Sequence, residues 1–177
     1  CENKKTVICG STWPKDEILL IKYIKNHPDS NYIIAPHELK NVANLHKQTD
    51  GLLYSDANKK NILSSNVLII DNIGLLSNIY RYGNLAYIGG GFGSGIHNIL
   101  EATAFGLPVI FGPNHKKFNE AICLIKEKGA VSITNYKQLS AAIDLFNNFN
   151  RSIALNYIQK NSGATSKILP LLSEPID

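Results

Sequence analysis

The sequence predicts an α/β fold in which helices cover both faces of a parallel β-sheet, a Rossmann-like three-layer arrangement. Short continuous apolar runs alternate at least five times with longer amphipathic stretches along the 177 residues. Such runs are typical of strands that are buried on both faces, as the strands of a parallel sheet are. No Asn-Gly hairpin signal joins one run to the next. Crossover connections through helices are therefore favoured over hairpins.

The strands are predicted from their apolar runs, which are rich in Val, Ile and Leu. They cover residues 6–10, 32–35, 52–54, 67–70, 85–88, 108–113 and 130–133. The intervening stretches place apolar side chains at helical spacing. These predict helices at residues 15–26, 39–47, 73–83, 96–106, 118–128 and 136–159, with a polar loop at 56–65.

Proline and glycine delimit the predicted elements. Pro14 lies just inside the first helix, where its missing N–H costs nothing, and Pro28 follows the end of that helix. Gly83 and Gly106 stop the third and fourth helices. Beyond them, Gly163 interrupts the helical pattern before a last apolar segment at 168–172. We expect the chain to form one domain over residues 1–177.

Polar and glycine clusters follow nearly every predicted strand. Because the carboxyl ends of parallel strands meet at one edge of the sheet, these clusters are expected to form a single rim, where ligands bind in open α/β sheets. The clusters are Gly10-Ser11-Thr12, Pro36-His37-Glu38, Asp71-Asn72, residues 89–95 and Gly112-Pro113-Asn114-His115.

The segment after the strand at 85–88 holds five glycines within seven residues, from Gly89 to Gly95. Glycine lets a ligand approach bare peptide groups, and a helix that starts after such a loop directs unpaired N–H groups at an anion. The spacing fits neither a dinucleotide fingerprint nor a P-loop, because Ile96-His97 stands where a P-loop needs Lys-Ser/Thr. The loop therefore indicates another kind of anion site, or only a turn.

His97, Asn98 and Glu101 are predicted to lie on the first turn of the helix that follows this loop. Residues 97 and 101 are four apart and would share a helix face. A carboxylate there can accept hydrogen bonds from the two vicinal hydroxyls of a ribose. The alternatives are that Glu101 only complements the helix dipole and that His97 only packs.

Charge and cysteine content narrow the function classes. Of the 18 basic residues only Arg81 and Arg151 are arginines, and the lysines are scattered, so no nucleic-acid surface is expected. The three cysteines lack metal-ligand spacing and no Asp-x-Asp triplet occurs, so no metal site is expected. No apolar run reaches the length of a membrane span.

Two motifs resemble the carboxyl-terminal domain of 3-deoxy-D-manno-octulosonic acid (Kdo) transferases, which are inverting, metal-independent glycosyltransferases of the GT-B architecture. They are Gly-Gly-Gly-Phe-Gly-Ser-Gly-Ile-His-Asn-Ile-Leu-Glu-Ala, residues 89–102, and Gly-Leu-Pro-Val-Ile-Phe-Gly-Pro-Asn-His-Lys-Lys-Phe, residues 106–118. The resemblance extends from about residue 6 to about residue 167, through Gly10-Ser11-Thr12-Trp13 and residues 34–38 and 71–76.

This resemblance implies that the chain binds the donor CMP-Kdo and needs no other cofactor. By motif match Glu101 binds the ribose hydroxyls. The other implied site residues lie beside the phosphate or the sugar of the donor, or at the rim. These are Ser11, Pro36, His37, Gly74, Gly90, Gly91, His97 and Asn98. Family members often carry an arginine where this chain has Leu39, so His37, Lys116 or Lys117 is expected to take over that phosphate contact.

The resemblance also implies that a second half is needed for catalysis. The family's general base is a carboxylate in an amino-terminal, acceptor-binding domain that is not in this chain. We therefore expect a soluble, inactive donor-binding fragment of a lipopolysaccharide-biosynthesis enzyme. The parent would meet its lipid A precursor at the cytoplasmic face of the bacterial inner membrane.

Two alternatives remain at this point. One is a GT-B transferase or epimerase domain that uses a UDP-sugar, since the glycine loop does not read the base. The other is a non-catalytic α/β interaction module, for which residues 168–172 would supply an exposed apolar patch.

Overall fold

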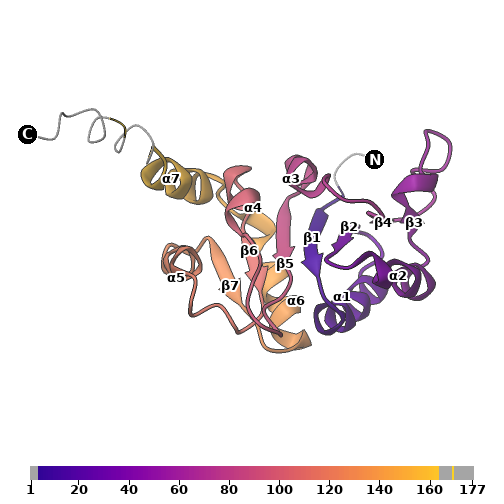
Figure 1. Ribbon diagram of the computed structural model, residues 1–177, viewed down its shortest axis with the longest axis horizontal. Helices are drawn as coiled ribbons and strands as arrows, with labels where there is room; N and C mark the ends of the chain where they lie inside the picture. Colours follow the sequence, from indigo (N-terminus) through magenta and orange to yellow (C-terminus); the bar gives the residue numbers. More distant parts are fainter. Residues whose placement is uncertain (1–3, 164–168, 170–177) are drawn as a thin grey trace, which may run out of the picture.

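The computed structural model of the chain describes residues 4–163 and residue 169. Within them, strands and helices alternate as Figure 1 shows. The strands are β1 (Thr6–Thr12), β2 (Asn31–Pro36), β3 (Leu52–Leu53), β4 (Val67–Ile69), β5 (Leu85–Ile88), β6 (Val109–Phe111) and β7 (Ala130–Ser132). The helices are α1 (Pro14–Asn26), α2 (Val42–Thr49), α3 (Leu76–Ile79), α4 (Leu100–Ala104), α5 (Asn119–Lys126), α6 (Tyr136–Leu145) and α7 (Ser152–Asn161), with short 3₁₀ turns at Leu39–Asn41, Tyr54–Asp56, Tyr80–Tyr82 and Phe146–Asn148.

The described strands form one sheet in the order β3-β4-β2-β1-β5-β6-β7. Every neighbouring pair is parallel. The chain places β2, β3 and β4 on one side of β1, with β4 between β2 and β3, and then returns to add β5 on the other side. β1 and β5 therefore flank the switch point of the sheet, where ligands bind in folds of this kind. The predicted α/β fold class is confirmed.

Two apolar cores cover the two faces of the sheet, and the period of two along each strand divides the side chains between them. Along β1, Val7 and Cys9 face the core formed with α1, α2 and α6. Ile8 lies in the other core, which residues from α4, α5 and α7 complete. Because side chains on both faces of the central strands are buried, these strands read as continuous apolar runs in the sequence.

The prediction of a helix over residues 96–106 was wrong at its start. Helix α4 begins at Leu100 and has five residues, and His97 and Asn98 lie in the loop before it. The His97 N–H donates to the Gly89 carbonyl at 3.1 Å, and the Leu100 N–H donates to Asn98 Oδ1 at 3.0 Å. These bonds give the backbone partners outside a helix. Residues 97 and 101 therefore do not share a helix face.

Two other predicted helices are shorter than expected. Within 73–83, Gly74 has φ +93° and α3 begins only at Leu76. Within 136–159, α6 ends at Leu145, and Phe149 is extended before α7 begins at Ser152. The predicted apolar segment at 168–172 lies outside the described residues, apart from residue 169.

Candidate functional site

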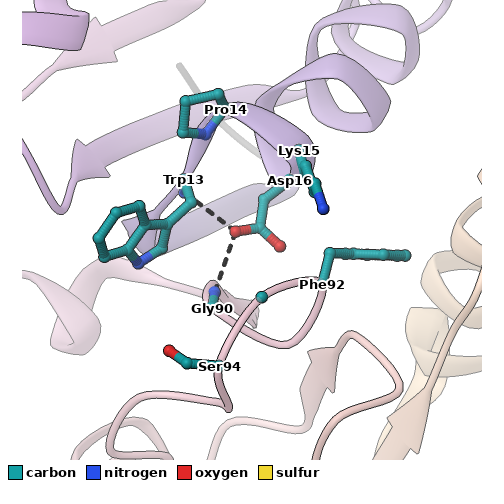
Figure 2. A pocket seen from close by; sticks show the side chains of 8 residues that line it. Trp13, Pro14, Lys15, Asp16, Gly90, Phe92 and Ser94 are labelled. Carbon is teal, nitrogen blue, oxygen red and sulfur yellow. Dashed lines mark hydrogen bonds between the residues drawn. The ribbon is translucent and has the colours of Figure 1, made fainter.

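The loops after β1 and β5 meet at the switch point, and the carboxylate of Asp16 joins them. Asp16 lies in the first turn of α1 and is fully buried. Its Oδ2 accepts the Trp13 N–H and the Gly90 N–H, both at 2.9 Å. Its Oδ1 accepts the Tyr87 hydroxyl at 2.7 Å. One carboxylate thus fixes the start of α1, the end of β5 and the beginning of the glycine loop. Figure 2 shows its bonds to Trp13 and Gly90.

The glycines of this loop serve mainly to bring backbones together. A Cβ on Gly89 would lie 2.2 Å from the Ser11 carbonyl oxygen, and a Cβ on Gly91 would lie 2.6 Å from the Gly112 backbone. Gly90 has φ +91°, a conformation that other residues rarely adopt. Close packing between backbones therefore accounts for Gly89 and Gly91 without a ligand.

Some amide groups of the loop nonetheless lack an acceptor within the described residues. The N–H groups of Gly90, Gly93 and His97 already have acceptors in Asp16 and the loop backbone. Among the described residues, no acceptor is found for the N–H groups of Gly91, Phe92 and Ser94. Adjacent free amides at a strand end can bind an anion, although Gly90 itself has no free donor to offer.

Three rings from three different loops stack at the rim. The Trp13 ring lies 4.6 Å from that of His37, which lies 4.4 Å from that of His97. The Trp13 indole N–H donates to His97 Nε2 at 2.9 Å. In the neutral imidazole the proton is therefore on Nδ1. Burial lowers the pKa of His97, and a positive charge on nearby His37 would lower it further. His97 is thus held as a neutral ring beside the glycine loop.

Asn98 and Glu101 form a second polar pair. Asn98 Nδ2 donates to Glu101 Oε1 at 3.0 Å. Asn98 is exposed and Glu101 is half-buried, on the first turn of α4. The Glu101 carboxylate is therefore not buried in the core. It can accept further hydrogen bonds from a hydroxylated ligand.

The remaining predicted residues lie at the rim but are not all in contact. Ser11 has φ +50° at an irregularity in β1, and Pro36 is buried at the end of β2, paired with Thr12. Gly74 is exposed in an open loop, and within the described residues no contact joins it to the stacked rings or to Glu101. Lys116 and Lys117 are exposed between β6 and α5.

A pocket of about 300 Å³ opens beside the glycine loop (Figure 2). Of the predicted site residues, Gly90 alone lines it. The other lining residues are Trp13, Pro14, Lys15, Asp16, Phe92, Gly93 and Ser94.

The sequence reasoning did not place Trp13 or Asp16 in the site. Locally, Asp16 looks like an ordinary acidic residue in a first helical turn. Its partners Tyr87 and Gly90 lie 71 and 74 residues away, so only the tertiary structure brings them together. The Gly-Ser-Thr-Trp motif at the end of β1 was the available signal for Trp13.

The fold is that of one half of the GT-B architecture, and the rim lies where ligands bind in such sheets. The chain superimposes on the C-terminal CMP-Kdo binding domain of WaaA from Acinetobacter baumannii with a TM-score of 0.72 and 20% identity, over 89% of this chain and 91% of that one. It also matches HepE of Anabaena in complex with UDP, with a TM-score of 0.63 and 18% identity, over 97% of this chain and 49% of that one.

The resemblance to Kdo transferases is confirmed at the sequence level. The chain is 29% identical over 172 residues to the 3-deoxy-D-manno-octulosonic acid transferase of Rickettsia typhi, covering 91% of this chain. It spans 37% of the length of that relative. No protein-family model matches the chain. No helix within the described residues is both long enough and apolar enough to cross a membrane.

Proposed function

We propose that this chain is the donor-binding half of a glycosyltransferase that moves Kdo from CMP-Kdo to a lipid A precursor. The observation that carries the proposal is the rim at the β1–β5 switch point, on a chain that resembles Kdo transferases over 91% of its length. An amino-terminal, acceptor-binding domain would complete the enzyme at the cytoplasmic face of the bacterial inner membrane. The chain on its own would bind the donor without turnover.

The proposed roles come from the motif match, and the site geometry is compatible with several of them. Glu101, oriented by Asn98, would accept hydrogen bonds from the ribose hydroxyls. The free amides of Gly91 and Phe92 would face the phosphate, with neutral His97 beside them. Ser11, Pro36, His37 and Gly74 would border the donor at the rim, and Gly90 would hold the loop in shape.

The proposed reaction is a direct displacement with inversion. A hydroxyl oxygen of the acceptor attacks the anomeric carbon of Kdo, and the bond from that carbon to the phosphate oxygen breaks. The electron pair leaves with CMP, and the hydroxyl proton passes to a base in the other domain. This half would stabilise the growing negative charge on the phosphate through backbone N–H groups, without a metal ion.

Calorimetric titration of the 177-residue chain with CMP tests the proposal, and Glu101→Ala tests the ribose contact. We expect the variant to bind CMP at least about tenfold more weakly, because hydrogen bonds to a carboxylate contribute about 1.5–3 kcal/mol each. Glu120→Ala is the matched control, since Glu120 is also half-buried in the first turn of a helix, α5. Equal CMP affinity of the wild type and Glu101→Ala would contradict the role of Glu101.

The same titration separates the alternatives. The chain shares its fold with HepE, which was solved in complex with UDP. A UDP-sugar enzyme would prefer UDP or UMP over CMP. A non-catalytic interaction module would bind none of the three nucleotides.

A further inference from the structure

The pocket beside the glycine loop is separate from the side chains proposed to hold the nucleotide. Glu101, Asn98 and His37 do not line it. It nonetheless adjoins the stacked rings. Trp13 lines the pocket and donates to His97, and a Cβ on Gly90 would lie 3.0 Å from His97 Cδ2. The pocket therefore lies next to His97.

The pocket has aromatic walls and a hydrogen-bonded carboxylate at its floor. Figure 2 shows the side chains of Trp13 and Phe92 on opposite sides of Asp16 and Gly90. The Asp16 carboxylate is fully buried and its oxygens accept three hydrogen bonds. Three of its roughly four acceptor positions are therefore occupied, and the walls offer apolar surface to a ring.

Lys15 supplies the only positive charge among the lining residues. Its side chain is exposed and extends toward Phe92 in Figure 2. Within the described part of the chain Lys15 has neither a hydrogen bond nor an ion pair. An ammonium group without a partner at the mouth of a pocket is suited to bind a carboxylate.

The volume limits the size of the occupant. Ligand pockets measure about 300–1,000 Å³, and this one, at about 300 Å³, is at the lower end. It therefore suits a single sugar better than a whole nucleotide sugar. The sugar of the donor would extend past His97 into it while the nucleotide stays at Glu101.

We propose that this pocket holds the transferred sugar and that Lys15 selects a sugar that carries a carboxylate at its anomeric carbon. This inference rests on the proposed function, because it assigns a subsite to the same donor. It adds a specificity residue, Lys15, that the motif match does not include.

The test compares the affinities of CMP and CMP-Kdo, the latter prepared enzymatically just before use, in the wild type and three variants. Lys15→Gln removes the charge, Lys15→Arg keeps it, and Lys25→Gln is the control, because Lys25 is exposed in the last turn of the same helix. We expect the preference for CMP-Kdo over CMP to fall about three- to tenfold in Lys15→Gln alone. The effect is limited to this range because solvent partly screens the ion pair between the Lys15 ammonium group and the sugar carboxylate. The affinity for CMP itself should not change.

The outcomes separate this inference from the proposed function. If CMP binds and Lys15→Gln keeps the full preference for CMP-Kdo, the subsite is wrong while the nucleotide site stands. If Lys25→Gln loses as much preference as Lys15→Gln, the effect is one of net charge and the subsite is again wrong. If the wild type binds neither CMP nor CMP-Kdo, the proposed function and the subsite fail together.

Discussion

Asp16 holds the site together through long-range hydrogen bonds. Its three donors come from the loop after β1, from β5 and from the glycine loop. Buried polar groups are costly to leave without partners, so these donors depend on the carboxylate. Glu17, the next residue, is also buried, and burial raises the pKa of its carboxyl group, which accepts the Thr12 hydroxyl at 3.0 Å. The two acidic residues anchor the start of α1 beneath the rim.

Asp16→Asn should lower the free energy of unfolding by about 2–4 kcal/mol. The amide NH₂ would face N–H or O–H donors that the carboxylate now satisfies. Urea unfolding followed by circular dichroism measures the change. Asp29→Asn is the control, because Asp29 is exposed and, within the described residues, makes no hydrogen bond or ion pair. Equal midpoints for Asp16→Asn and the wild type would contradict the anchoring role.

The glycine loop after β5 positions its free amides through contacts between backbones. It packs directly on the end of β1, at Ser11, and on the loop after β6, at Gly112. Helix α4, which follows, has only five residues, so its dipole contributes little to anion binding. In the proposed site, the loop amides rather than the helix would therefore bind the anion.

Gly91→Ala and Gly93→Ala form a matched pair that tests this packing. A Cβ at position 91 would lie 2.6 Å from the Gly112 backbone, whereas one at position 93 would meet only the Gly90 oxygen, at 3.5 Å. We expect Gly91→Ala to lose about 1–3 kcal/mol of stability and Gly93→Ala to stay within about 0.5 kcal/mol of the wild type. Thermal unfolding of both variants measures this. A loss at position 93 as large as that at position 91 would refute the close-packing explanation.

The sheet with its two cores buries several tyrosine hydroxyls as well as apolar side chains. Burial raises the pKa of Tyr23 to about 12 and moves the pKa values of Tyr32, Tyr80 and Tyr87 still higher above their ordinary value of 10.0. At Tyr80 the negative charge of Glu101 adds to the effect. The folded state therefore retains phenolic protons that the unfolded chain loses above about pH 10.

Stability should therefore decline as the pH rises from about 9 to about 11, because the folded state binds more protons than the unfolded state in that interval. Urea midpoints across this range measure the decline. Tyr80→Phe isolates one contribution, since within the described residues the Tyr80 hydroxyl makes no hydrogen bond. The variant should match the wild type near neutral pH and lose less stability in alkali. A wild-type profile that stays flat to about pH 11 would contradict this account.

Particular residues show why the fold was easier to predict than the site. The runs around Val7, Ile34 and Ile110 are apolar at every position because both sides of the sheet are buried, and that pattern is visible locally. The helix at 96–106 was mispredicted because hydrogen bonds to Gly89 and within the loop outweigh helix propensity at His97 and Asn98. The roles of Glu101 and the other predicted site residues stay predictions, with Glu101 accessible to a ligand.

The parallel sheet, the rim of polar and glycine clusters and the resemblance to Kdo transferases could all be predicted from the amino-acid sequence. Each depends on composition, periodicity or a motif, which residues close together in the chain carry. The contacts of Asp16 with Trp13, Tyr87 and Gly90, the stacking of Trp13, His37 and His97, and the pocket at Lys15 and Phe92 became visible in the folded chain alone. Those contacts join residues that are far apart in the chain, and they exist because the parallel strand order places β1 beside β5.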